Sequence, residues 1–170
     1  ADIAGRQVNL VELSVSHYLL ARALESGDLA MTDVRTVNTA DADIAAAYTS
    51  PDVTAAVAWN PQLLTMKQEP GTRQVFSSAD IPGEILDLLV VDTATLEANP
   101  DLGKALVGIW YETLALMQQD DEAGAAARAA MAQLAGTTPE MFEAQLATTH
   151  LYVEPGQAVA AATADPLVET

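Results

Sequence analysis

Hydroxyl, imidazole and carboxylate side chains cluster near the start of the chain, in the run ELSVSH at residues 12–17. The run follows an apolar, strand-like segment at residues 8–11 and opens a helix. There, Ser14 or Ser16 would accept a hydrogen bond from an orphan backbone N–H as a helix cap. The same helix end offers free N–H groups and the positive end of the helix dipole, which suit a small anion or polar group. The run therefore predicts either an ordinary helix cap or a ligand-binding helix start.

The sequence contains few residues of the types that catalysis or metal binding needs. The chain holds two histidines, His17 and His150, and no cysteine, which argues against a His-rich metal site, a Cys-ligated zinc, an iron–sulfur cluster and a Ser-His-Asp triad. Ser14 lacks the glycine pattern of a nucleophile elbow, and no glycine-rich phosphate loop is present. Asp41 and Asp43 have the positions that the dipole favours in a first helical turn. The residues favour binding over catalysis and predict no metal and no cofactor.

The charge balance narrows the set of partners. Seven Lys and Arg stand against 24 Asp and Glu, a formal net charge of −17. Such a chain repels nucleic-acid phosphates and anionic membrane surfaces, so neither is expected as a partner. No segment reaches the ~18 uninterrupted apolar residues that suggest a membrane span. The first six residues do not have the pattern of a signal peptide, so a leader is expected to be absent from this chain.

The first half alternates strand-like and helix-like segments, which indicates βαβ units and a parallel sheet. Right-handed crossovers place the carboxyl ends of such strands along one edge, where open α/β sheets bind ligands. Glu12, Asn38, Trp59 and Asn60 all lie at the carboxyl ends of predicted strands. The expected strands are residues 8–11, 34–37, 54–59 and 74–77, and the expected helices are residues 16–26, 40–48 and 62–68.

The second half is mostly helical. A continuous apolar run at residues 85–91, broken only by Asp87, predicts one buried strand. Helices are expected from Asp92 onward, and Trp110 and Tyr111 are expected in the core of a long one; the predicted ranges are 101–118, 123–134, 139–148 and 157–164. One strand does not make a sheet, so either another segment or a partner chain must supply the strands on which these helices pack.

Four ordered runs together resemble the periplasmic substrate-binding proteins of bacterial ABC importers, of the taurine/nitrate/sulfonate type, including the branch associated with urea and guanidine metabolism. They are ELSVSHYLL at 12–20, VNT at 37–39, AVAWNP at 56–61 and PGEILDLLVV at 82–91. The resemblance implies the α/β class. A type II periplasmic-binding-protein-like lobe, with a parallel-rich sheet flanked by helices, precedes a mostly helical C-terminal part.

The resemblance also implies a domain division and a site. Residues 1–82 would be the second, ligand-binding lobe of a bilobal protein. Residues 83–170 would cross over and supply a strand and helices to the first lobe, whose N-terminal part has no counterpart here, as in a fragment. By position, Ser14, Ser16 and His17 would cap the ligand's polar head, and Trp59 and Asn60 would form a wall of the pocket.

Glu12 is a further candidate contact, argued from its charge. A carboxylate pairs well with planar N–H donors and repels a sulfonate, so it favours an amine, amidine, guanidine or urea over a taurine-like ligand. The resemblance implies a non-enzymatic, periplasmic or cell-surface protein that captures a small polar solute and delivers it to an ABC permease, without inserting into the membrane. Two alternatives stay open: an enzyme on the same scaffold, related to thiamine-pyrimidine synthesis, and a stand-alone dimeric interaction domain.

Overall fold

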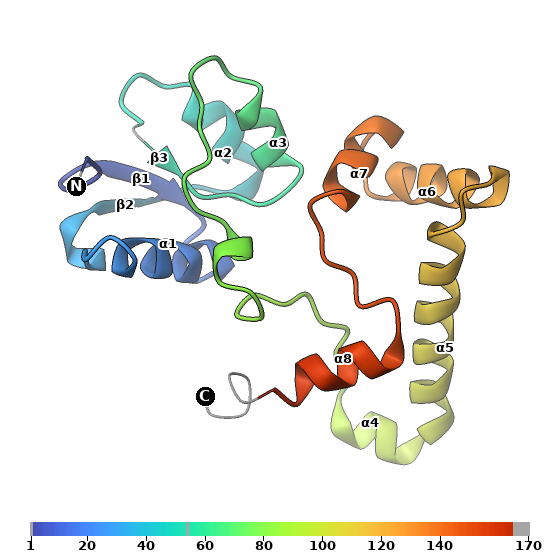
Figure 1. Ribbon diagram of the computed structural model, residues 1–170. Helices are drawn as coiled ribbons and strands as arrows, with labels where there is room; N and C mark the ends of the chain where they lie inside the picture. Colours follow the sequence, from blue (N-terminus) through green and yellow to red (C-terminus); the bar gives the residue numbers. More distant parts are fainter. Residues whose placement is uncertain (1, 54, 165–170) are drawn as a thin grey trace. The chain divides into compact units, whose positions relative to one another are not determined.

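The computed structural model describes residues 2–53 and 55–164. The chain divides into two compact units, Ala1–Ile85 and Leu86–Thr170, which are described in turn. The first contains the sheet and the second consists of helices (Figure 1).

The first unit is built on a three-stranded parallel sheet with β1 in the centre. Its strands are β1 (Gln7–Leu10), β2 (Arg35–Asn38) and β3 (Ala55–Ala56), in the order β2-β1-β3. Val8 pairs with Thr36 on one side and with Ala55 on the other. The prediction of parallel strands in this half is confirmed, although β3 is shorter than the expected 54–59, whose first residue, Thr54, lies outside the described residues.

Helices cover both faces of this sheet. Helix α1 (Val15–Glu25) lies on one face, and α2 (Asp41–Tyr48) and α3 (Gln62–Lys67) lie on the other (Figure 1). Successive strand side chains point to opposite faces, so Val8 and Leu10 pack against Leu20 and Leu24 of α1 in one buried cluster. The buried Asn9 lies between them in sequence. The clean alternation fixes which face of β1 receives α1.

The expected fourth strand at residues 74–77 is not formed. This segment has no regular structure and is followed by a short 3₁₀ helix, η2 (Ser78–Asp80); another, η1 (Met31–Asp33), precedes β2. Val75 is exposed. A strand is stabilised by its neighbours, and no described strand lies beside this segment to accept it.

The second unit contains five helices among its described residues: α4 (Thr93–Ala98), α5 (Pro100–Met117), α6 (Glu122–Leu134), α7 (Pro139–Leu146) and α8 (Pro155–Ala162). Side-chain caps set three of the starts, because Asp92, Asp121 and Thr138 each accept a backbone N–H three residues on. In the part of the chain that the structure describes, no helix combines the length and hydropathy needed to cross a bilayer.

Two expectations for this unit are wrong. Residues 85–91 form no strand, and Leu88, Leu89 and Val90 are exposed instead of buried. Trp110 of α5 is also exposed and does not belong to the core. Both errors have one physical cause: an apolar segment is buried only where another layer covers it, and the described part of this unit contains no sheet.

Candidate functional site

The start of α1 is capped by Ser14. Ser14 has an extended backbone, and its Oγ accepts the Ser16 backbone N–H at 3.1 Å. The same hydroxyl donates to the Val11 carbonyl at 2.6 Å. Ser14 therefore joins the end of β1 to the first turn of α1 and holds this turn in one position, and both hydrogen-bonding roles of its hydroxyl are in use.

Ser16 lies in the first turn of α1 with only 2% of its surface exposed. Its backbone N–H is satisfied by Ser14, but its hydroxyl has no hydrogen-bond partner among the described residues. At a helix N-terminus, where the dipole and free N–H groups also favour a polar ligand, the Ser16 hydroxyl is available to donate and to accept.

His17 fixes the backbone ahead of the helix. Its Nδ1 accepts the Leu13 backbone N–H at 3.2 Å. Leu13 has a φ of 58°, in the left-handed region that non-glycine residues rarely occupy. The His17 bond therefore helps to hold an unfavourable turn next to the cap. A ligand contact by His17 stays a prediction.

Glu12 is anchored on the neighbouring strand. Its backbone N–H donates to Asn38 Oδ1 at 3.0 Å, and its Oε1 accepts the Thr36 hydroxyl at 3.1 Å. The sequence did not reveal these contacts, because pairing with β2 is not visible in the local pattern. They place the Glu12 carboxylate on the β2 side of the α1 start.

Trp59 and Asn60 follow β3. Trp59 is 37% exposed, so it is not a core residue. The Asn60 side-chain oxygen is closed to solvent and has no partner among the described residues. The same holds for one oxygen each of Asp41 and Gln62, whose other groups bond to each other at 2.8 Å. Three acceptor oxygens near the starts of α2 and α3 thus lack a donor, and N–H groups would satisfy them.

The structure brings the predicted residues to one edge of the sheet in two groups. Glu12, Ser14, Ser16 and His17 are joined through the turn between β1 and α1, whereas Trp59 and Asn60 follow the adjacent strand β3. Within residues 2–53 and 55–164, no hydrogen bond joins the two groups, and no set of three His, Asp or Glu side chains is placed to hold a metal. Parallel topology alone places them at a common edge.

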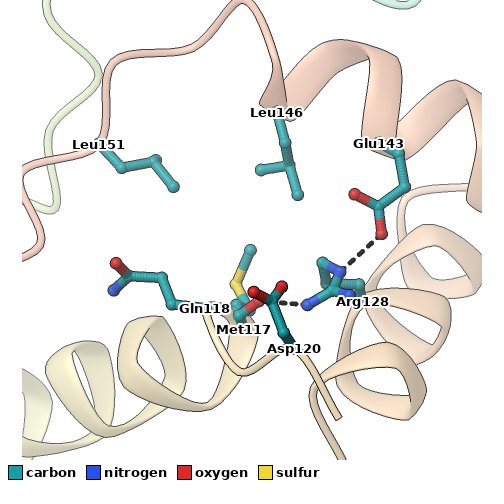
Figure 2. A pocket seen from close by; sticks show the side chains of 7 residues that line it. All are labelled: Met117, Gln118, Asp120, Arg128, Glu143, Leu146 and Leu151. Atoms are coloured by element: carbon teal, nitrogen blue, oxygen red, sulfur yellow. Dashed lines mark hydrogen bonds and ion pairs between the residues drawn. The ribbon is translucent and has the colours of Figure 1, made fainter. Parts of the chain in front are cut away.

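A separate cavity of about 280 Å³ lies within the helical unit, and none of the residues that line it is a predicted site residue (Figure 2). It is lined by Met117, Gln118, Asp120, Arg128, Glu143, Leu146 and Leu151. Arg128 donates from Nε to Glu143 at 2.6 Å and from Nη1 to the carbonyls of Met117 and Gln119. These carbonyls lie at the C-terminal end of α5, where backbone acceptors lack helical partners. The guanidinium is therefore engaged in closing a helix end.

The comparisons with known proteins agree with this architecture. A family model described as NMT1/THI5 like matches residues 1–124. The periplasmic aliphatic sulphonate binding protein SsuA from Escherichia coli is similar in structure, with a TM-score of 0.69 and 22% sequence identity. The alkanesulfonate-binding protein SsuA from Xanthomonas axonopodis pv. citri, solved with MOPS, is similar with a TM-score of 0.64 and 23% identity.

Each of these alignments covers 99% of this chain but 58% of the solved protein. The chain therefore spans a little over half the length of the binding proteins it matches. Among curated proteins, none matches it. The likeness confirms the predicted fold class: an α/β lobe with a parallel sheet, followed by a helical part.

Proposed function

The chain belongs to the NMT1/THI5-like family, and from this premise we propose that it is part of the solute-binding component of an ABC importer. In this role it captures a small polar, nitrogen- or sulfur-containing organic solute and delivers it to a membrane permease. The proposed location is the periplasm or the cell surface. The role is non-enzymatic, since recognition of the solute needs only hydrogen bonds and closure around it.

The observation that carries the proposal is the state of Ser16. Ser16 is 2% exposed as a residue, its hydroxyl makes no hydrogen bond to a described residue, and it lies in the first turn of an 11-residue helix. This helix follows the central strand of a parallel sheet, at the edge where open α/β sheets bind ligands. Ser14 and His17 already have protein partners, so we propose that they hold the turn and that Ser16 contacts the solute.

The acceptor groups favour an N–H donor as the solute. The Glu12 carboxylate, held by Thr36, would attract a cation and repel a sulfonate. The unpartnered oxygens of Asp41, Asn60 and Gln62 need donors and not a further acceptor. We therefore favour an amine, amidine, guanidine or urea over a taurine-like ligand, with the exposed Trp59 as an aromatic wall.

The division into lobes is part of the same proposal. Residues 1–82 would form the second lobe of a bilobal binding protein, and residues 83–170 would belong to the first. The exposed apolar residues of the segment 85–91 support this assignment, because a strand of the missing part of the first lobe would cover them.

A thermal-shift series tests the proposal. The 170-residue chain is heated with taurine, an alkanesulfonate, nitrate, urea, guanidine or small amines. A solute that binds the folded state stabilises it by ~2.7 kcal/mol at a hundredfold excess over its dissociation constant. We expect urea, guanidine or an amine to raise the melting temperature and the sulfonates to leave it unchanged.

Matched serine variants locate the contact. Ser16→Ala should abolish the shift, whereas Ser26→Ala, at the exposed C-terminal end of the same helix, should keep it. A shift that survives Ser16→Ala would refute the site. No shift with any solute would contradict a competent pocket, and a shift with taurine alone would overturn the proposed ligand class while keeping the binding role.

A further inference from the structure

The carboxylate of Glu84 is held by three donors from one helix. It accepts the Tyr18 hydroxyl at 2.6 Å, Arg22 Nε at 2.7 Å and Arg22 Nη2 at 3.1 Å. The guanidinium thus binds the carboxylate with two N–H groups, the geometry of the stronger ion pairs. Glu84 stands at the end of the first unit, whose last residue is Ile85.

Tyr18 and Arg22 are four residues apart on α1, so they share one face of the helix. The N-terminal turn of the same helix contains Ser14 and Ser16. A helix of 11 residues is stiff along its length. The proposed solute site and the start of the connector between the units are therefore attached to a single rigid element.

The chain is well ordered by contacts up to Glu84. Asp80 caps the 3₁₀ turn through the Ser77 backbone N–H at 2.7 Å, Ile81 is buried, and the Glu84 N–H donates to the Ile81 carbonyl at 3.2 Å. The described residues directly after Glu84 lack such contacts. Residues 85–91 take part in no backbone hydrogen bond with any described residue, and the next fixed feature is the Asp92 cap of α4.

We propose that Glu84 is a clamp that ties residues 81–84, the start of the connector, to α1. Gly83 has a φ of 86°, which suits glycine. Pro82 and Gly83 lie between the buried Ile81 and the clamped Glu84, so they are held at both ends. Residues 81–84 therefore move together with α1.

Cleavage by a glutamyl endopeptidase tests the clamp, because the protease must take the Glu84 side chain into its own pocket to cut the Glu84–Ile85 bond. In the wild-type chain this bond should be cut slowly. Tyr18→Phe, which removes one donor, should accelerate this cut by roughly threefold, and Arg22→Gln, which removes two, by roughly tenfold or more. Cutting after Glu97 in α4 serves as the internal reference. The rates are measured by intact mass.

Glu25→Gln is the matched control. Glu25 is the other carboxylate that Arg22 touches, so this variant leaves all donors to Glu84 in place and should cut at the wild-type rate. Equal rates in the wild type and in Arg22→Gln would overturn the proposal, as would an equal acceleration by Glu25→Gln. If Arg22→Gln loses its circular dichroism signal, Tyr18→Phe decides the matter, and an unchanged rate overturns the clamp. Amide exchange in residues 81–84 should rise in the same variants while that of β1 stays constant.

Discussion

The contacts of Glu84 with Arg22 and Tyr18 depend on the Glu84 carboxylate being ionised. The Arg22 guanidinium and the Tyr18 hydroxyl lower the pKa of Glu84 below its ordinary value, and the Glu84 hydrogen bond raises the pKa of Tyr18. Protonation of Glu84 removes the ion pair with Arg22. A group with a lowered folded-state pKa stabilises the fold above its ordinary pKa, and this contribution disappears as the pH falls through the lowered value.

The lowered pKa of Glu84 predicts how the stability of the fold changes with pH. Wild type should be more stable than Glu84→Gln near neutral pH, and the difference should shrink as the pH falls below the ordinary pKa of a glutamate, about 4.3. Urea unfolding of the two proteins at a series of pH values measures the difference in their free energies of unfolding. The other titratable groups are the same in both proteins, so their contributions cancel in this difference. A difference that stays constant with pH, or grows toward acid, would contradict an ionised clamp.

Local residue roles were more predictable than long-range ones. The Ser14 cap was one of two positions expected from the hydroxyl before an apolar periodic segment, because capping acts within three residues. Glu84 bonds to Tyr18 and Arg22 from more than sixty positions away, and no local pattern reports such a pairing. The partners of Glu12 on β2 were missed for the same reason.

At the scale of elements, Arg128 of α6 connects three helices. It closes the C-terminal carbonyls of α5 and pairs with Glu143 of α7. Its side chain is 19% exposed, whereas that of Glu143 is 53% exposed. The bond to the Met117 carbonyl is therefore the better shielded part of this junction.

Arg128→Gln should destabilise the helical unit by about 1–3 kcal/mol, since it leaves the partly buried Met117 carbonyl without its charged donor. Glu143→Gln removes only the exposed ion pair and should lose less than about 1 kcal/mol. Urea titration followed by far-ultraviolet circular dichroism compares the two variants. Equal losses would show that the ion pair, and not the helix closure, holds the junction.

Helix positions were predicted better than strand positions. The predicted helices at residues 16–26 and 101–118 are found at Val15–Glu25 and Pro100–Met117, because caps and the 3.6-residue periodicity are local signals. The strands expected at 74–77 and 85–91 are not formed. Strand propensity indicates a fit to a pleated, half-buried surface, and it needs a neighbour that the local sequence does not specify.

At the scale of the whole molecule, the two units differ in how well their apolar residues are covered. The first buries Val8, Leu10 and Ile44 completely. The second exposes three consecutive apolar residues, Leu88, Leu89 and Val90, on a backbone without hydrogen bonds to described residues. An apolar, strand-prone segment with free backbone groups is a template for pairing with another chain.

Val90→Lys should therefore reduce self-association of the chain. Val75→Lys is the control, since Val75 is exposed to nearly the same degree, 77% against 79%, but lies outside the apolar run. Static light scattering across a concentration series measures the mass. We expect the wild type and Val75→Lys to gain mass with concentration and Val90→Lys to stay monomeric. A wild-type chain that is monomeric throughout would contradict this reading and the dimeric alternative alike.

The family and the fold were both accessible from sequence. The family model over residues 1–124 shows that the chain is NMT1/THI5 like, and its fold is that of two solved sulfonate-binding proteins, which agrees with the predicted fold class. The contacts of Trp59 and Asn60 with a solute, and the identity of that solute, remain predictions. Both depend on the exact positions of side chains, which the short sequence runs that indicate the family do not specify.

The central position of β1 sets the order in which the sheet can be made during translation. Val8 pairs with Thr36 and with Ala55, so the strand that is synthesised first must wait for both of its neighbours to leave the ribosome. Closing these long loops is slow compared with forming helices. Once Glu84 has emerged, every partner of the first unit is present, and this unit can fold while the ribosome is still producing the helices that follow.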